Sequence, residues 1–299
     1  MTRLTSRRIQ AATALCAVVA WPALAQSRDA TPNASVRTIT SARQLRDGDS
    51  LRVRVYHSAG PLDVRAASTP LLYNVSVRYE PAFSTFVRRF DSTSRTLVVG
   101  VDSASAGFHL RFWREVPEKA KEHPSSLTLA LGRGVPLDLR LDFGASAATV
   151  DLTDLSVERL VMRFGASETK LFFGTANPLR MQELRIQCSA GTLTARQLGN
   201  ANAPRVEIEG VAAGLDLDLS GAWSHDMEIN ADVVMGGLSL HVPDDVGVRV
   251  VTQRELLAEV ETPGFVTRDG ARYSANWDSA PRKLTVNAKA LMGGVSLKQ

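Results

Sequence analysis

From residue 51 onward, apolar and polar residues alternate with a period of two along most of the chain. Leu51, Val53 and Val55 fall on one side of such a segment, and the residues between them fall on the other. The alternation returns at 73–79, at 97–101 and through most of the second half. A period of two is typical of β-strands with one buried face. The sequence therefore predicts an all-β protein with few or no helices.

An alternating segment, a turn of small residues and a second alternating segment recur in the second half. The small residues that mark the copies are Ser146, Ser167, Gly191, Gly214, Gly237 and Gly294, at spacings of 21, 24, 23, 23 and 57 residues. A repeat of about 22 residues cannot bury an apolar face alone, so the copies are expected to stack around one core. Stacked corners leave room only for small residues, and glycine also accepts a positive φ. The pattern predicts a solenoid-like stack of short strands, similar to a β-helix, with the markers at its corners.

The repeat sets the domain organisation that we predict. Residues 126–299 are expected to form the solenoid. Residues 51–116 are expected to form a small β-rich N-terminal domain, in which 51–64 resembles one further, degenerate copy of the repeat. The short charged segment 116–124, which is bounded by prolines, is interpreted as the linker between them.

The 57-residue spacing indicates an excursion at 246–283. It contains a helix-tolerant patch at 254–260 and an Asp269-Gly270 pair, which is typical of a tight hairpin turn. We interpret the excursion as a hairpin whose return strand, 284–288, completes the stack and covers its edge.

The first 25 residues have the pattern of a secretory signal peptide. Three arginines precede about 15 apolar residues and an A-x-A motif that ends at Ala25, after which cleavage is expected. The apolar run is too short for a membrane-spanning helix, which needs about 20 residues, although an uncleaved anchor is the alternative. Residues 26–50 are polar and are interpreted as a flexible lead-in with a first strand near 36–39. The sequence thus predicts export to the periplasm or cell surface, without a transmembrane segment after cleavage.

Cleavage changes the charge and the cysteine count. The formal charge of +4 loses three arginines and no acid, which leaves roughly +1 and no concentrated basic face, so nucleic acid is not an expected partner. Cys16 leaves with the signal peptide, and Cys188 remains without a partner for a disulfide. Cys188 shares a side with Leu184 and Ile186, so a buried, inert thiol is expected.

No catalytic, cofactor-binding or metal-binding motif is present. The sequence lacks a G-x-S-x-G elbow, a paired-histidine zinc motif, a phosphate loop and a C-x-x-C pair. The Gly165-Ala166-Ser167 corner lacks the last glycine and the following helix of a nucleophile turn. The histidines are scattered and are interpreted as solvated surface residues: His57, His109, His123, His225 and His241. We therefore predict no catalytic residue, no cofactor and no metal site, and a protein that is not an enzyme.

Aligned carboxylates leave an enzymatic alternative open. Neighbouring rungs could bring acids together as a cation site or as the acid pair of a polysaccharide-cleaving enzyme. The simpler interpretation is a solvated polar face, with Arg140 and Arg163 as opposite charges. Three or more acids and bases converging in a groove would favour an enzyme, and a flat face of Ser, Thr and Arg would favour binding. The acids are Asp138 and Asp142, Asp151 and Asp154, and Asp216 and Asp218.

Three tryptophans offer a second alternative. Trp113, Trp223 and Trp277 could stack on sugars, but they are far apart in sequence and near the ends of predicted elements. Packing over a solenoid end or under a loop is the simpler interpretation.

Several segments resemble a known family. The resemblance is carried by Val135-Pro136-Leu137-Asp138-Leu139, Leu198-Gly199-Asn200-Ala201, Leu217-Asp218-Leu219-Ser220-Gly221-Ala222-Trp223 and Val242-Pro243-Asp244-Asp245-Val246-Gly247-Val248. These look like the toast-rack domain of LiaF-like cell-wall-stress proteins and adhesin-like bacterial proteins. Leu71-Leu72-Tyr73-Asn74-Val75 and Leu97-Val98-Val99 resemble the small domain that often precedes it. The resemblance covers about residues 50–299 and implies an extracytoplasmic solenoid, in some members tied to stress signalling or adhesion.

The sequence also departs from this family. LiaF-like regulators carry transmembrane helices ahead of the domain, whereas this chain has a predicted cleavable signal there, which argues against direct control of a membrane kinase. Several corners read Gly-Ala-Ser or Met-Gly-Gly where Gly-Ala-Gly is usual. The family has no agreed catalytic residues. We therefore expect an exported, non-enzymatic module that binds an unknown envelope component, glycan or protein, in adhesion or as a scaffold. A polysaccharide-acting enzyme and an extracytoplasmic partner of a stress sensor are the alternatives.

Overall fold

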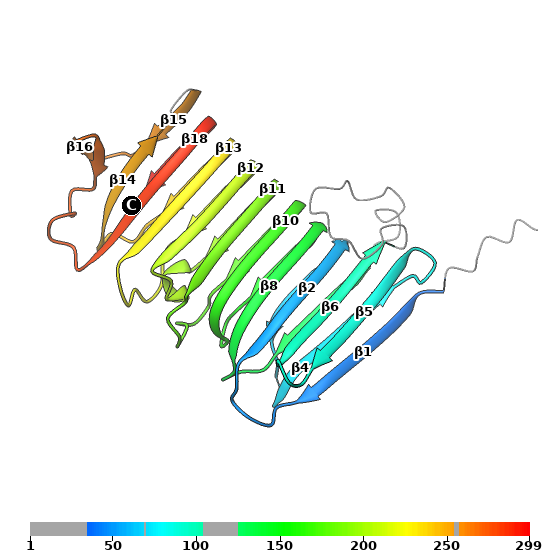
Figure 1. Ribbon diagram of the computed structural model, residues 1–299. Helices are drawn as coiled ribbons and strands as arrows, with labels where there is room; N and C mark the ends of the chain where they lie inside the picture. The colour runs from blue at the N-terminus through cyan, green and yellow to red at the C-terminus, as the bar shows by residue number, and fades with distance from the viewer. Residues whose placement is uncertain (1–34, 69, 104–124, 254–256) are drawn as a thin grey trace, which may run out of the picture. The chain divides into compact units, whose positions relative to one another are not determined.

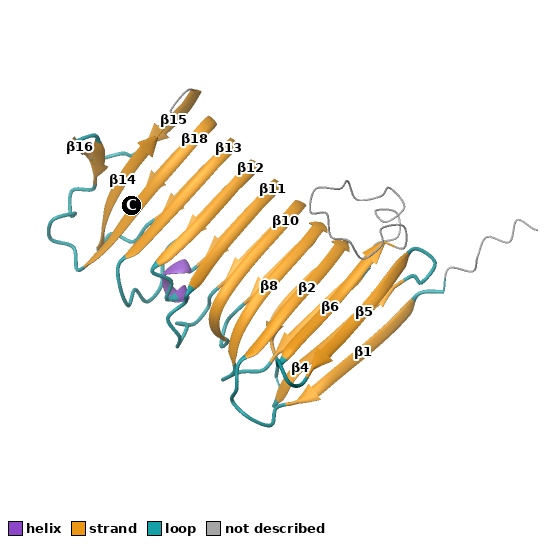
Figure 2. Cartoon of the chain, viewed as in Figure 1, coloured by secondary structure: helices purple, strands orange, loops and turns teal. Residues whose placement is uncertain are grey.

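Strands and short turns make up nearly all of the structure, a computed structural model that describes residues 35–68, 70–103, 125–253 and 257–299 (Figures 1 and 2). Four predictions fall outside these residues: the signal peptide, the linker at 116–124, the histidines His109 and His123, and Trp113. The described residues belong to one unit, Ala34–Gln299. No helix among them is long and apolar enough to cross a membrane.

The described residues contain eighteen strands and one 3-10 turn, at Leu198–Ala201. They are β1 (Arg37–Gln44), β2 (Leu51–Ala59), β3 (Leu62–Ala66), β4 (Leu71–Tyr79), β5 (Ser84–Asp91), β6 (Thr96–Ser103), β7 (Ser126–Leu131), β8 (Pro136–Ala145), β9 (Ala147–Asp151), β10 (Ser156–Phe172), β11 (Glu183–Arg196), β12 (Arg205–Asp218), β13 (Met227–His241), β14 (Val246–Gln253), β15 (Leu257–Glu261), β16 (Val266–Arg268), β17 (Ala271–Tyr273) and β18 (Arg282–Lys298).

Each repeat is a rung with two arms that meet at a corner. In β10 to β13 and β18 one long strand forms both arms, whereas β2/β3, β8/β9 and β14/β15 form the two arms as separate strands. Both arms pair in parallel with the next rung; β10 and β11, for example, align Leu160 with Leu184 and Leu171 with Ala195. The spatial order is β2/β3, β8/β9, β10, β11, β12, β13, β18 and β14/β15. The predicted solenoid-like stack is confirmed.

The core is built from columns of aliphatic side chains that run from rung to rung. Alternation places every second residue of an arm inside, and parallel pairing in register places it above its counterpart. The first-arm column is Val53, Leu139, Leu160, Leu184, Val206, Ile229, Val286 and Val250, all buried. The second-arm column is Val64, Val150, Leu171, Ala195, Leu217, Leu240 and Leu297, also buried. No rung could bury these residues alone.

The marker residues line up at the corners in two groups of three. Ser146 donates from its backbone N–H to Ser167 Oγ, and Ser167 pairs with Gly191. Gly214, Gly237 and Gly294 form a second line one residue further along the rung, because Gly191 pairs with Ala213.

The backbone itself demands glycine at the residue before two of these markers. Gly236 and Gly293 have φ of 123° and 133°. A Cβ on Gly236 would overlap the carbonyl oxygen of Ala213 on the rung below. The corner therefore excludes any side chain at this position.

Turns close the third side of each coil and contain buried asparagines. Asn177 Nδ2 donates to Val157 O at 2.8 Å and to Ala201 O at 3.0 Å, while its Oδ1 accepts from Val157 N at 2.9 Å. Asn200 Nδ2 likewise donates to Phe173 O at 2.7 Å. These amides satisfy backbone groups that the irregular turns leave without a sheet partner.

The N-terminal end differs from the prediction in one respect. The predicted lead-in contains β1, which is longer than the strand expected near 36–39 and pairs antiparallel with β4. It forms because β4 offers an edge, and Ile39 packs against the core. The degenerate repeat copy at 51–64 is confirmed, since β2 and β3 pair in parallel with β8 and β9. The division into two domains stays a prediction.

The C-terminal end corrects the predicted excursion. The return strand does not cover the edge: β18 lies between β13 and the rung formed by β14 and β15, which is the outermost parallel rung. The helix-tolerant patch contains strand β15, because pairing with β18 outweighs local propensity. The Asp269-Gly270 hairpin is confirmed, with Arg268 opposite Ala271 and positive φ at both turn residues.

Candidate binding groove

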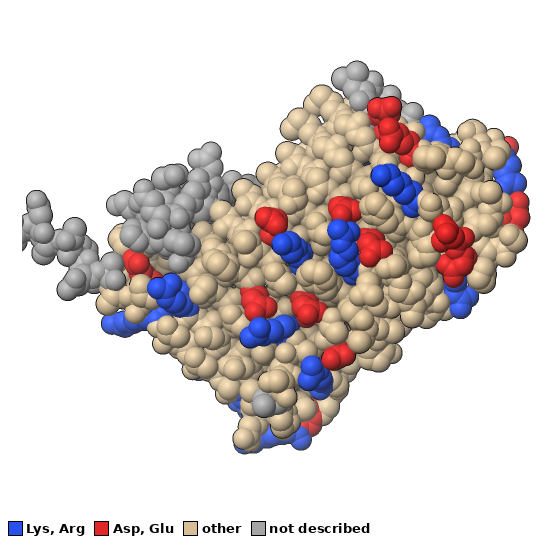
Figure 3. All heavy atoms as spheres, turned by 180° about the vertical axis from the view of Figure 1, so that it is seen from behind, with Lys and Arg blue, Asp and Glu red and all other residues tan. Residues whose placement is uncertain are grey.

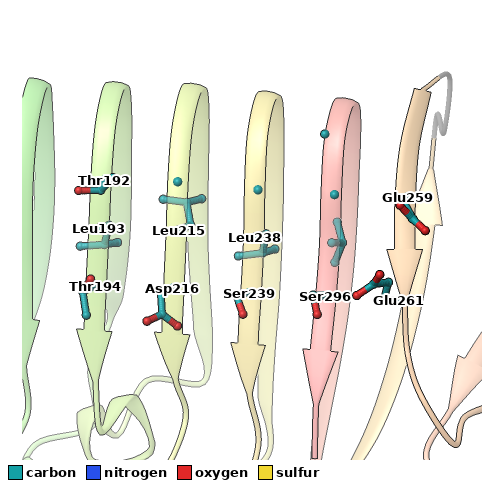
Figure 4. A pocket seen from close by; sticks show the side chains of 15 residues that line it. Thr192, Leu193, Thr194, Leu215, Asp216, Leu238, Ser239, Glu259, Glu261 and Ser296 are labelled. Atoms are coloured by element: carbon teal, nitrogen blue, oxygen red, sulfur yellow. The ribbon is translucent and has the colours of Figure 1, made fainter.

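An open groove of about 620 Å³ lies on the outer side of the second arms of β11, β12, β13 and β18, ending at β15 (Figure 4). Its floor is a line of glycines, Gly214, Gly237 and Gly294, which we call the glycine row. Thr192 of β11 and Glu259 of β15 continue this line at the two ends. Because the floor has no side chains and both ends do, the surface is hollowed between them.

The backbone does not require the glycine row. None of its three residues has a positive φ. A Cβ on Gly237 would lie 3.8 Å from Gly294 O, and a Cβ on Gly294 would lie 3.6 Å from Glu259 O, which is ordinary contact. Glycine inside a strand is unfavourable and often marks a site where a ligand or another backbone approaches closely. Within the described residues, neither the backbone nor close packing therefore explains why Gly237 and Gly294 are glycine, whereas both explain Gly236 and Gly293.

A polar row runs beside the glycine row, two residues further along each strand. It consists of Thr194, Asp216, Ser239, Ser296 and Glu261, in register across five strands. Asp216 is already paired, with Arg196 Nη2 at 3.0 Å and His241 Nε2 at 3.2 Å. Glu259 and Glu261 are exposed and form no ion pair with any described residue. The groove therefore has a free negative charge at its β15 end.

An exposed apolar ridge borders the other side of the glycine row, at the corners of the last rungs. This corner ridge consists of Val211, Val234, Met235, Leu291 and Met292, which are 37–44% exposed. Met235 and Met292 pair directly and stand immediately before Gly236 and Gly293. At the N-terminal end of the stack the same corners carry only glycine, alanine or serine, at 144–146 and 165–167. The groove thus has one apolar and one polar bank.

One row on the outer side of the first arms neutralises its own charge. In this row acidic and basic residues alternate from β2 to β13, and adjacent ones form ion pairs: Arg52 with Asp138 at 3.4 Å, Arg159 with Glu183 at 3.7 Å, and Arg205 with Glu228 at 3.1 Å. On the face shown in Figure 3, acidic and basic side chains lie next to one another across the middle of the molecule. Such pairs fit the solvated polar face that the sequence suggested. Asp142 is an exception, because it pairs with Arg140 at 3.2 Å but is only 4% exposed.

The structure corrects one histidine prediction. His57 is 2% exposed, packs in register with Phe143 and places Nε2 3.1 Å from Gly60 O. Burial lowers the pKa of His57 to about 4. His225 and His241 reach the surface as predicted. His57 is buried because it continues the inward side of β2 after Leu51, Val53 and Val55.

The remaining candidates occupy structural positions. Cys188 is buried, and desolvation raises the pKa of its thiol to about 11. Trp223 Nε1 donates to Leu219 O at 2.8 Å inside a turn. Trp277 packs edge-on against Tyr273 at 5.4 Å. None of these side chains lines the groove.

The carboxylates do not converge within the described residues, where no group of three or more His, Cys, Asp or Glu is placed to hold a metal ion. Asp216 and Glu261 lie three strands apart in the polar row, which is roughly 14 Å at 4.8 Å per strand. Glu259 and Glu261 lie side by side on one strand, so they do not flank a bond from two sides as glycosidase carboxylates do.

Sequence reasoning missed the groove. The marker glycines were interpreted as corners, and β15 as a helix-tolerant patch. The available signal was the doubled glycine in Met235-Gly236-Gly237 and Met292-Gly293-Gly294, since one glycine suffices for a corner. A second hollow, near β3, β7 and β9, is lined by Asp151 and by the ion pair of Arg65 with Asp63, 3.3 Å apart.

These features define a class of protein: an all-β solenoid of stacked, cornered rungs with an open groove on one side. A family model described as the N-terminal domain of toast_rack, DUF2154, matches residues 31–181, just over half of the sequence. The chain belongs to the toast-rack family. The match extends beyond the predicted N-terminal domain and includes β8, β9 and β10.

Several solved structures of bacterial proteins have a similar chain course. A candidate cell adhesion protein from Clostridium sporogenes is 12% identical, with 89% of this chain and 100% of that chain covered and a TM-score of 0.45. A candidate adhesin from Bacteroides fragilis is 10% identical, with 89% and 99% covered and a TM-score of 0.35. One from Parabacteroides merdae is 9% identical, with 89% and 98% covered and a TM-score of 0.34. No curated protein sequence matches the chain significantly.

Proposed function

We propose that this protein is an exported, non-enzymatic binding module of the bacterial envelope that holds its ligand in the groove on the second arms. The observation that carries the proposal is the glycine row. Three strands forgo a side chain at positions where the backbone has space for one, and the resulting hollow has chemically distinct banks. A predicted signal peptide supports the location in the periplasm or at the cell surface.

The shape of the groove indicates an extended ligand. The glycine row crosses the strands, so the groove runs along the stack axis from β11 to β15. Four strand spacings of about 4.8 Å give a length of about 19 Å. An extended segment of a polymer, a glycan or a polypeptide, fits this shape better than a compact small molecule. Attachment of such a polymer would serve adhesion or scaffolding.

Filling the groove tests the proposal. The mature chain, residues 26–299, is screened against a glycan array and against envelope extract, as wild type and as the Gly237→Thr/Gly294→Thr variant. Gly165→Thr is the matched control, because a Cβ there would lie 3.6 Å from Gly144 and outside the groove. Ligands that the control retains and the groove variant loses support the proposal. Equal capture by all three proteins would contradict it.

A further inference from the structure

We infer that the groove accepts a cationic, amphipathic stretch of polypeptide, with basic side chains at Glu259 and Glu261 and apolar side chains on the corner ridge. The inference rests on the proposed function and specifies its ligand. The groove length of about 19 Å corresponds to about six extended residues at 3.4 Å each.

Charge is the first argument for this chemistry. No lysine or arginine lines the groove in the described part of the chain, and the acidic lining residues are Asp216, Glu259 and Glu261. Arg196 and His241 already pair with Asp216. Asp138 and Glu228, on the first-arm side, are each matched by an arginine on an adjacent rung. Glu259 and Glu261 form no ion pair within the described part of the chain, so a positively charged ligand complements the β15 end.

The corner ridge is the second, independent argument. Its five apolar side chains lie together on three consecutive rungs, β12, β13 and β18. Clustered exposed apolar residues mark interaction sites more often than isolated ones do. Methionine side chains, which are unbranched and flexible, adapt to different apolar partners. A ligand that contacts both banks must carry apolar and basic groups on opposite sides, as a polypeptide with alternating residues does in an extended conformation.

The surrounding charges favour a polypeptide over a membrane surface. Apolar residues that insert into anionic bilayers are usually flanked by lysine or arginine. Beside this ridge lie Glu259 and Glu261 on one side and Glu209, Asp232 and Lys289 on the other, so four acids stand against one base. These acids would be repelled by anionic lipid headgroups.

Peptide binding to the mature chain tests the inference. The probe is a fluorescent peptide of about eight residues, alternating lysine and leucine, compared with peptides that alternate glutamate and leucine or lysine and serine. Phosphatidylglycerol vesicles test the membrane alternative. The variants are Glu259→Gln/Glu261→Gln for the charged end and Met235→Ser/Met292→Ser for the ridge. Asp244→Asn/Asp245→Asn is the matched control, since it removes the same charge from exposed residues outside the groove.

We expect the lysine–leucine peptide to bind and the other two peptides to bind at least tenfold more weakly. The glutamine variant should weaken binding by roughly two- to tenfold and reduce its dependence on salt, as loss of exposed ion pairs predicts. The serine variant should weaken binding by a similar factor, and the control should match wild type.

Three results would overturn the inference: no binding of the lysine–leucine peptide, equal binding by the glutamine variant, or vesicle binding that survives in that variant. If one of these results is obtained but Gly237→Thr/Gly294→Thr loses envelope ligands that wild type binds, the proposed function stands and only the preference for a cationic ligand is wrong. If the threonine variant loses nothing, both fail.

Discussion

Replacing Gly237 and Gly294 by threonine should make the protein more stable while it abolishes binding in the groove. Both residues lie within strands, have ordinary φ and leave ordinary contact distance for a Cβ. Glycine in a strand interior costs about 0.5–1 kcal/mol relative to alanine, and threonine is the better strand former. The double variant should therefore gain about 1–2 kcal/mol in the free energy of unfolding.

Substitution of the neighbouring Gly236 should instead lower the stability of the fold. Gly236→Ala forces an L-residue into φ of 123° and pushes its Cβ into the Ala213 carbonyl. A left-handed backbone alone costs about 1–2 kcal/mol, and the displaced rung adds to this. Adjacent substitutions in one Met-Gly-Gly corner should thus change stability in opposite directions.

Urea denaturation followed by circular dichroism measures both effects. At an unchanged slope, the midpoint of the threonine variant should rise and that of Gly236→Ala should fall. If the threonine variant is destabilised as much as Gly236→Ala, the glycine row has a structural cause after all. The reasoning that assigns it to a ligand would then be wrong.

Three further predictions concern buried groups. His57 has a pKa of about 4 in the folded protein and about 6.5 in the unfolded chain. Between these pH values the unfolded chain binds more protons than the folded protein does. The free energy of unfolding should therefore fall by about 3 kcal/mol as the pH drops from 6.5 to 4. His57→Phe should flatten this slope in urea titrations at several pH values, whereas His241→Phe should leave it. Cys188, whose pKa is raised to about 11, should resist thiol reagents at pH 8 until urea unfolds the chain, and fast labelling of the native protein would contradict its burial. Asn177→Ala should lower the free energy of unfolding by about 2–4 kcal/mol, because it leaves the N–H and C=O of Val157 buried without their partner. Thermal or urea unfolding measures this loss, and a loss below about 1 kcal/mol would show that the turn rearranges to satisfy these groups.

The local parts of this fold could be predicted from the sequence, and its long-range order could not. Alternation identified the strands and the inward side chains, because each residue's side depends only on its neighbours. The same rule applied to 51–59 would have placed His57 inside, next to Val55 and Ala59. The order β13, β18, β14 depends on which distant strands pair, and the regular 22-residue spacing favoured the simpler sequential order.

The groove was harder to predict for a related reason. A glycine required by a corner and a glycine left free for a ligand are identical in the sequence. Gly236 and Gly237 differ only in φ and in the atoms opposite them, which the structure supplies. Glu259 joins the groove only because β15 pairs with β18.

The position of β18 has a consequence for how the chain reaches its final state. During synthesis β14 and β15 emerge first, yet their parallel partner on the stack is β18, which follows them. The strands β14 and β15 therefore cannot join the stack in the order of synthesis. They form their parallel pairing only after β18 has been made and has paired with β13. Removal of β18 would delete an internal rung of the stack. Because β14 and β15 pair in parallel with β18, a chain that ends before β18 would also lose the rung that they form.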